Sequence, residues 1–190
     1  MIIYKTDMNT KSVKMDYMEP LTHLSAKHEK CLKKFSKRKD KEVKSNIENK
    51  DFEFVKASSN YWYFRFTVLD GPYKDQTHIV EMKLVYGVHP DVFIYPNNAP
   101  LCKFITNIWH PNISNKGTIC LDILKDEWSA TITTSNIINS ITLLLLNPDI
   151  SSPLNRTAAD MFDDNNTYTK KIKSCYTDTK NIENYTKLFD

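Results

Sequence analysis

The sequence predicts an α+β fold in which one helix precedes a four-stranded antiparallel meander sheet and three helices follow it. Three observations support this order. Apolar residues recur at helical spacing over residues 21–39, they alternate with polar residues in strand-like runs between residues 52 and 106, and helical spacing returns after residue 133. With 190 residues, of which 41% are hydrophobic, the chain is large enough to bury one hydrophobic core.

The first predicted helix, residues 21–39, is amphipathic. Residues 1–20 before it lack apolar periodicity and are predicted to be a flexible extension. Its inward stripe consists of Leu21, Leu24, His28, Leu32 and Phe35, with Cys31 beside them. The opposite face and the exit of the helix are basic and comprise Lys27, Lys30, Lys33, Lys34, Lys37, Arg38, Lys39, Lys41 and Lys44. This face is either a solvated surface or a docking surface for an acidic partner.

Four strands are predicted over residues 52–57, 61–69, 78–85 and 101–106, after a polar connection at residues 44–50. In the second strand Trp62, Phe64 and Phe66 alternate with more polar residues. Short connections join the first three strands, which is typical of an antiparallel meander. The fourth strand follows a proline-containing loop at residues 89–100.

Three helices are predicted in the last third of the chain. The first begins with Thr133, Thr134 or Ser135 as its cap and ends at Pro148. The other two are predicted over residues 155–163 and 168–177. Residues 179–190 form either a tail or the end of the last helix.

Composition excludes several classes of protein. The net charge of +3 is too small for a typical nucleic-acid-binding protein, and no aromatic residues interleave with the basic helix face to stack on bases. The four cysteines (Cys31, Cys102, Cys120 and Cys175) have neither the spacing of a metal site nor that of a disulfide framework, so no metal or other cofactor is expected. No apolar leader or membrane-spanning segment is evident, and we expect a protein of the cytoplasm, the nucleus or both, without a membrane partner.

Residues 110–154 contain the motif on which the functional prediction depends. A polar turn, His110-Pro111-Asn112, is followed after eight residues by Cys120 and after eight more by Trp128. A thiol with a side-chain amide upstream suggests acyl transfer through a thioester. The HPNI, G-x-I-C-L-D-I-L, W-S and P-L-N motifs at these spacings resemble the active-site segment of ubiquitin-conjugating enzymes. The resemblance covers residues 21–178 as a catalytic domain and is motif-specific over residues 95–155.

The resemblance implies that Cys120 accepts the modifier as a thioester from an activating enzyme in an ATP-dependent pathway. Sulfur suits this exchange because a thiolate is both a good nucleophile and a good leaving group. A lysine then attacks the thioester, and Asn112 either stabilises the resulting oxyanion or orders the loop that does so. The residues expected to have structural roles in this segment are His110, Pro111 and Trp128.

The side of the acceptor lysine departs from the family pattern. Ser152 stands where many relatives carry an acidic residue, and Asp122 is ranked above Asp149 as a nearby source of negative charge. Two positions that contact RING-type ligases in relatives also differ, because Asn97 and Ala130 replace the usual residues. The segment between Val85 and Tyr95 is a few residues longer than in typical members.

The predicted partners follow from the same resemblance. Lys30, Lys33 and Lys34 are the candidate contacts for the activating enzyme, and a RING-type ligase is expected to bind the loaded protein. The modifier is predicted to be ubiquitin. A carrier of the cullin modifier (neddylation) remains an alternative, because the Met-Ile start and the DFEF, NIWHPNI and P-L-N segments also resemble those carriers. A non-catalytic adaptor of the same fold is a further alternative, against which the presence of Cys120 and Asn112 argues.

Overall fold

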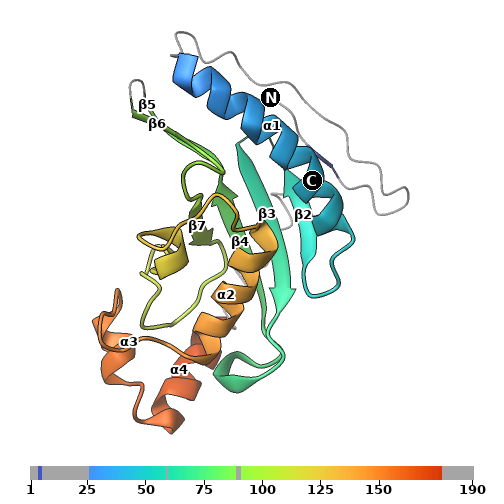
Figure 1. Ribbon diagram of the computed structural model, residues 1–190. Helices are drawn as coiled ribbons and strands as arrows, with labels where there is room; N and C mark the ends of the chain where they lie inside the picture. Colours follow the sequence, from blue (N-terminus) through green and yellow to red (C-terminus); the bar gives the residue numbers. More distant parts are fainter. Residues whose placement is uncertain (1–3, 6–25, 59, 89–90, 177–190) are drawn as a thin grey trace.

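The computed structural model of the chain describes residues 4–5, 26–58, 60–88 and 91–176. Most of the predicted extension (1–20), the start of the predicted first helix (21–25) and the predicted tail (179–190) lie outside these ranges. Within them, the α+β order is confirmed. A first helix, an antiparallel sheet, the segment around Cys120 and three further helices follow one another along the chain (Figure 1).

The central sheet is antiparallel, with the strand order β1-β2-β3-β4-β7. Its main strands are β2 (Glu53–Ala57), β3 (Tyr61–Thr67), β4 (Thr77–Lys83) and β7 (Leu101–Phe104), which are the four that the sequence predicts. The two-residue strand β1 (Tyr4–Lys5) pairs with the outer edge of β2.

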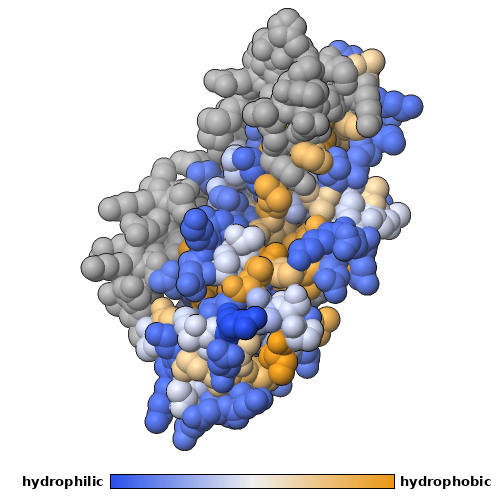
Figure 2. Space-filling model, turned by 90° about the vertical axis from the view of Figure 1, so that its left-hand side faces the viewer, coloured by the Kyte–Doolittle hydropathy of each residue, from blue (hydrophilic) through white to orange (hydrophobic). Residues whose placement is uncertain are grey.

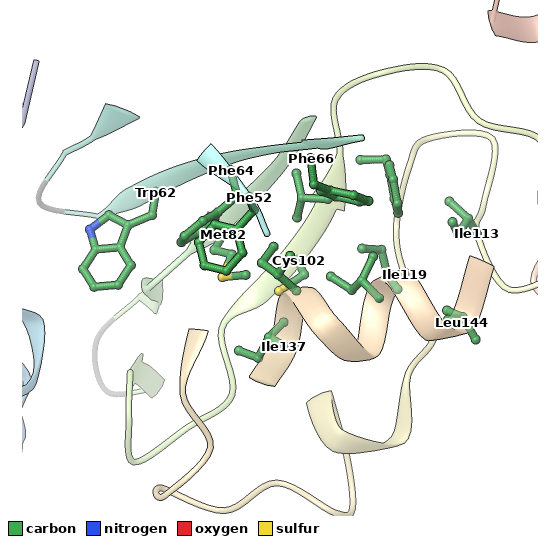
Figure 3. Close-up of a cluster of buried hydrophobic side chains, with 14 of the residues drawn as sticks. Phe52, Trp62, Phe64, Phe66, Met82, Cys102, Ile113, Ile119, Ile137 and Leu144 are labelled. Atoms are coloured by element: carbon green, nitrogen blue, oxygen red, sulfur yellow. The ribbon is translucent and has the colours of Figure 1, made fainter. Parts of the chain in front are cut away.

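One face of the sheet forms the hydrophobic core with helix α2 (Thr134–Leu146). In β3, Trp62, Phe64 and Phe66 are buried and the residues between them are exposed or half-buried, as the alternation predicts. Figure 3 shows aromatic side chains of the sheet gathered above α2, which contributes Ile137. Truncating a buried aromatic side chain typically costs about 3–5 kcal/mol. This layer therefore fixes α2 against the sheet.

Helix α1 (Ala26–Ile47) continues well beyond the end predicted at residue 39. The polar connection predicted at residues 44–50 is wrong for residues 44–47, which belong to the helix. Glu42 and Asn46 are only 4% and 1% exposed and lie on its packing face. Placing Arg38 and Lys39 on the exposed basic face is wrong as well. Lys39 is buried beside a phenylalanine ring, and the guanidinium of Arg38 binds backbone carbonyls of residues 130–132.

A two-stranded sheet that the sequence analysis did not predict lies at the end of the molecule near α1 (Figure 1). It consists of β5 (Val85–Val88) and β6 (Asp91–Ile94). The predicted third strand therefore ends before Val85. The chain leaves the central sheet at Leu84, whose N–H donates to the carbonyl of Asn60 at 2.7 Å and whose carbonyl accepts from the N–H of Tyr95 at 2.9 Å.

The three helices predicted in the last third of the chain are present. Thr133 is the N-cap of α2, and its hydroxyl and the amide of Asn136 form a capping box. Helices α3 (Arg156–Asp160) and α4 (Asn165–Tyr176) follow at the opposite end of the molecule from α1 (Figure 1). In the described part of the chain, every helix is too short or too polar to cross a bilayer.

Candidate active site

His110 fixes the polar turn that precedes Cys120. It is buried, its Nδ1 accepts from the N–H of Asn112 at 3.0 Å, and its Nε2 therefore carries the proton and donates to the carbonyl of Leu144 at 2.9 Å. Burial lowers the pKa of His110 to about 4, although the bond to Leu144 opposes this shift. A neutral ring with both nitrogens engaged suits the predicted structural role and leaves neither nitrogen to act as a base.

The depressed pKa of His110 predicts a pH-dependent stability. An unfolded histidine titrates near pH 6.5, so the folded state binds fewer protons between pH 6.5 and about 4. The contribution of this group is fully present above pH 6.5 and is lost as the pH falls through about 4, amounting to about 3 kcal/mol at most. Urea unfolding at several pH values, combined with an NMR titration of the His110 ring, measures this effect. Protonation of the folded ring near pH 6.5 would contradict it.

Asn112 is 2% exposed and ties two loops together. Its side-chain Nδ2 donates to the carbonyl of Asp149 at 2.6 Å, and its Oδ1 accepts from the N–H of the same residue at 2.9 Å. Its own carbonyl accepts from the N–H of Cys120 at 2.9 Å. Of the two roles predicted for Asn112, these contacts favour the ordering of the loop.

Cys120 follows a turn that requires glycine. Gly117 has φ +82°, and a Cβ there would lie 2.1 Å from the carbonyl oxygen of Phe104. The turn returns the chain to Ile119, which forms an isolated antiparallel bridge with Ile113. The backbone of Cys120 is held in place by the hydrogen bond from its N–H to the carbonyl of Asn112. The residue as a whole is half-buried.

Lys125 lies directly beside Cys120, a contact that the sequence analysis missed. Its Nζ is 2.6 Å from the Cys120 Sγ. The residues between them form a 3-10 turn (Asp122–Leu124) that folds the chain back on itself. The pKa of Lys125 is raised, and the main cause is its hydrogen bond to Cys120. The sequence feature that could have predicted this contact is a basic residue five positions after the cysteine, at the end of a short turn.

The residues predicted on the acceptor-lysine side lie in two exposed segments. Asp122 is exposed in the turn after Cys120 and contributes to the raised pKa of Lys125. Ser152 is exposed in the loop that Asn112 holds. The Asp149 carboxylate in this loop accepts from the hydroxyl and the N–H of Ser151 at 2.6 and 2.8 Å, which lowers the pKa of Asp149. The face of the molecule that carries the Cys120 segment is mostly hydrophilic around a patch of apolar side chains (Figure 2).

The predicted ligase-contact positions both lie beside α1. The Asn97 side chain donates to the Cys31 sulfur at 2.6 Å, and the carbonyl of Ala130 accepts from Arg38 at 3.1 Å. Between them, the indole N–H of Trp128 donates to the carbonyl of Pro96 at 3.1 Å. The side chains of Lys30, Lys33 and Lys34 are exposed on α1.

A buried polar network connects α1 to the chain that follows Cys120, and the sequence analysis missed it. The Glu42 carboxylate accepts from Arg38, from the hydroxyl of Tyr95, and from the N–H and hydroxyl of Thr134 at 2.9 and 2.7 Å. Burial and the neighbouring Glu42 raise the pKa of Tyr95, which therefore stays a neutral donor. Because Thr134 begins α2, the same carboxylate also satisfies a donor at the helix N-terminus.

No group of three or more histidine, cysteine, aspartate or glutamate side chains in the described ranges is arranged to hold a metal ion. The groups near Cys120 are the amine of Lys125, the carboxylate of Asp122 and backbone amides. Around Cys120, that set of groups suits the transfer of an acyl group.

Fold and site together define a protein with a half-buried cysteine on the loop between an antiparallel sheet and a packed helix. Residues 27–176 match the model of the ubiquitin-conjugating enzyme family. The chain belongs to this family, and its α+β architecture is the ubiquitin-conjugating fold.

Curated relatives align with shorter parts of the chain. It is 45% identical over 80 residues to ubiquitin-conjugating enzyme E2 2 of Debaryomyces hansenii, covering 42% of this chain and 48% of that protein. It is 47% identical over 72 residues to ubiquitin-conjugating enzyme E2 21 of Caenorhabditis elegans, covering 37% and 34%. For the E2 2 enzyme of Fusarium solani the identity is 36% over 105 residues, covering 55% and 65%. The chain thus spans about half the length of the curated relatives it matches, and the names of these three proteins do not indicate the neddylation subtype.

Proposed function

We propose that the chain is a ubiquitin-conjugating enzyme that receives ubiquitin as a thioester on Cys120 and passes it to a lysine with the help of a ligase. The observation that carries this proposal is the half-buried Cys120 whose N–H is anchored to Asn112 in the motif of the family. Transthioesterification moves the acyl group from the sulfur of the activating enzyme to Cys120 and releases the first thiol. Attack by an amine then forms an amide and releases Cys120.

A loading assay tests this proposal. The protein is incubated with ATP, ubiquitin and the ubiquitin-activating enzyme and is run on non-reducing gels. We expect an adduct that a thiol reductant removes, complete loss of that adduct in Cys120→Ala, and a reductant-resistant ester in Cys120→Ser. Cys102→Ala is the matched control, because Cys102 is buried in the core. Loading of Cys120→Ala as efficiently as the unchanged protein would contradict the assignment of the nucleophile.

The same assay distinguishes the two modifiers. Ubiquitin is favoured because the similar curated proteins bear the name ubiquitin-conjugating enzyme. A parallel reaction with the cullin modifier and its activating enzyme tests the neddylation alternative. An adaptor of the same fold would bind a partner without forming either adduct.

We further propose that the exposed face of α1 binds the activating enzyme. Lys33 and Lys34 follow Lys30 by three and four residues, so each of them lies beside Lys30 on one side of the helix, where the three charges attract an acidic partner. Replacing all three with glutamate is expected to raise the apparent KM for the activating enzyme, by roughly tenfold at low salt, with little change in kcat. The control triple variant changes the exposed Lys74, Lys103 and Lys170 to glutamate, which alters the net charge equally. If both triple variants raised the apparent KM equally, the exposed face of α1 would be only a solvated surface.

A further inference from the structure

A groove of about 1220 Å³ lies between the end of strand β3 and helix α2. Its walls come from the end of α1, from β2 and β3, and from α2. Two apolar side chains that line it are largely exposed: Leu69, just after β3, is 80% exposed, and Leu143 of α2 is 59% exposed. Apolar side chains that face one groove from two elements indicate a surface that another apolar segment covers.

The groove exists because β3 continues beyond its pairing with β2. That pairing extends only to Arg65, whereas β3 runs on to Thr67. The next residue, Val68, donates its N–H to the carbonyl of Gln76 at 2.9 Å, on the side of β4. Residues 67–69 therefore border the groove along an edge that no strand of the described ranges covers.

Helix α4 ends close to this groove. It packs beside the 3-10 turn η1 (Gly71–Tyr73), which joins β3 to β4 (Figure 1). The hydroxyl of Tyr168 in α4 lies 2.8 Å from the hydroxyl of Tyr73 in this turn. At the end of the helix, the hydroxyl of Tyr176 accepts from the N–H of Thr77 at 3.0 Å, and Thr77 is one of the residues that line the groove. The described chain therefore ends beside the groove.

The 14 residues after Tyr176, residues 177–190, lie outside the described ranges, and their sequence has an amphipathic pattern. At about 100° per residue, their large apolar side chains fall on one stripe about 120° wide, which is typical of a helix that buries one face. The connecting residues 177–181 span up to about 17 Å, and two strand spacings amount to about 10 Å. The stripe can therefore reach both Leu69 and Leu143. Its members are Ile182, Tyr185, Leu188 and Phe189.

We propose that residues 177–190 bind the groove of the same molecule as a short amphipathic helix whose apolar stripe covers Leu69 and Leu143. This segment is the favoured occupant because it starts beside the groove and carries a stripe that matches the exposed apolar side chains. So short a helix is marginal in water on its own, so its formation depends on packing in the groove. The contact requires no thioester, and the inference is independent of the proposed function.

Amide hydrogen exchange of the full chain, measured by NMR, tests this inference from the side of the groove. Leu69→Ser and Leu143→Ser each remove an exposed apolar side chain from the groove. Leu101→Ser is the matched control, because Leu101 is 50% exposed on β7, away from the groove. We expect the amides of residues 182–189 to exchange at least about tenfold faster in the two groove variants than in the unchanged protein and the control.

Equal exchange of these amides in all four proteins would overturn the inference. If that exchange were fast, the segment would be unbound, and if it were slow, the segment would form a helix without the groove. Protection that increases with protein concentration would overturn it as well, because a second copy would then supply the occupant.

Variants of the segment itself test the same contact from the other side. Phe189→Ser and Leu188→Ser should each shift the methyl NMR signals of Leu69 and Leu143, since they alter the apolar stripe. Lys187→Ser is the matched control, because position 187 lies on the opposite side of the predicted helix. Methyl signals that are unchanged in the first two variants, or equally shifted in all three, would contradict the assigned occupant of the groove.

Discussion

Replacing Glu42 with alanine is expected to lower the free energy of unfolding by about 3 kcal/mol, because it removes a buried carboxylate that accepts several hydrogen bonds. The carboxylate is 4% exposed and accepts hydrogen bonds from Arg38, Tyr95 and Thr134. Its removal leaves the Thr134 N–H without its acceptor, and Arg38 and Tyr95 keep only their hydrogen bonds to backbone carbonyls of residues 130–132. Urea denaturation at pH 7 measures the change as a lower midpoint with an unchanged m-value.

An exposed ion pair provides the matched control. Glu53 pairs with Arg65 across β2 and β3, and their side chains are 50% and 45% exposed. Glu53→Ala should cost less than about 1 kcal/mol, because solvent screens such pairs. Glu42→Gln keeps the shape but replaces one acceptor oxygen by a donor, so an intermediate loss is expected. If Glu42→Ala cost no more than Glu53→Ala, the buried network would not stabilise the fold.

The parts of the fold that the sequence predicts are those in which one periodic pattern describes both the element and its burial. The alternation around Trp62 and Phe64 gives strand β3 and its inward face, and the segment from Thr133 to Pro148 gives α2 with its cap and its end. Both patterns are local. Their agreement with the structure follows from the fact that apolar side chains dominate the free energy of burial.

The polar network around Glu42 could not be predicted in this way. Acidic and basic residues on a helix usually indicate a solvated face, and the predicted helix ended at residue 39, before Glu42. Thr134, the partner that makes Glu42 a packing residue, lies 92 positions away in the sequence. The burial of Glu42 depends on a tertiary contact that no single helical pattern contains.

The candidate site likewise combines residues that a local motif identifies with contacts that it does not predict. The motif identifies Cys120 and Asn112, but the partners of the Asn112 side chain are backbone atoms of Asp149, which any residue at that position would supply. The Lys125 contact depends on the direction of a 3-10 turn. Sequence reasoning therefore leaves the role of Asn112 open between oxyanion stabilisation and loop ordering, and the geometry allows the two roles to be separated.

Replacing Asn112 with alanine is expected to reduce discharge of the thioester to free lysine by about tenfold or more, while loading of Cys120 persists. The substitution removes two hydrogen bonds to the backbone of Asp149, at a cost of about 1–3 kcal/mol for the pair. The loop that carries Ser152 then loses its anchor to the Cys120 segment. Single-turnover discharge and hydrogen exchange of the Asp149 amide are measured on the same samples.

Hydrogen exchange distinguishes the two roles, because loop ordering predicts that the Asp149 amide loses its protection together with the discharge rate. Oxyanion stabilisation alone predicts slower discharge with the amide still protected. Asn112→Asp retains an acceptor for the Asp149 N–H and loses the donor to its carbonyl. If Asn112 orders the loop, this variant should lie between the unchanged protein and Asn112→Ala in both discharge rate and amide protection. Asn46→Ala is the matched control: Asn46 is 1% exposed and bonds to Thr134, so its loss should reduce stability without changing the exchange of Asp149. Because the side chain of Asn112 already satisfies both backbone groups of Asp149 before any substrate is bound, we expect the discharge rate and the protection to fall together.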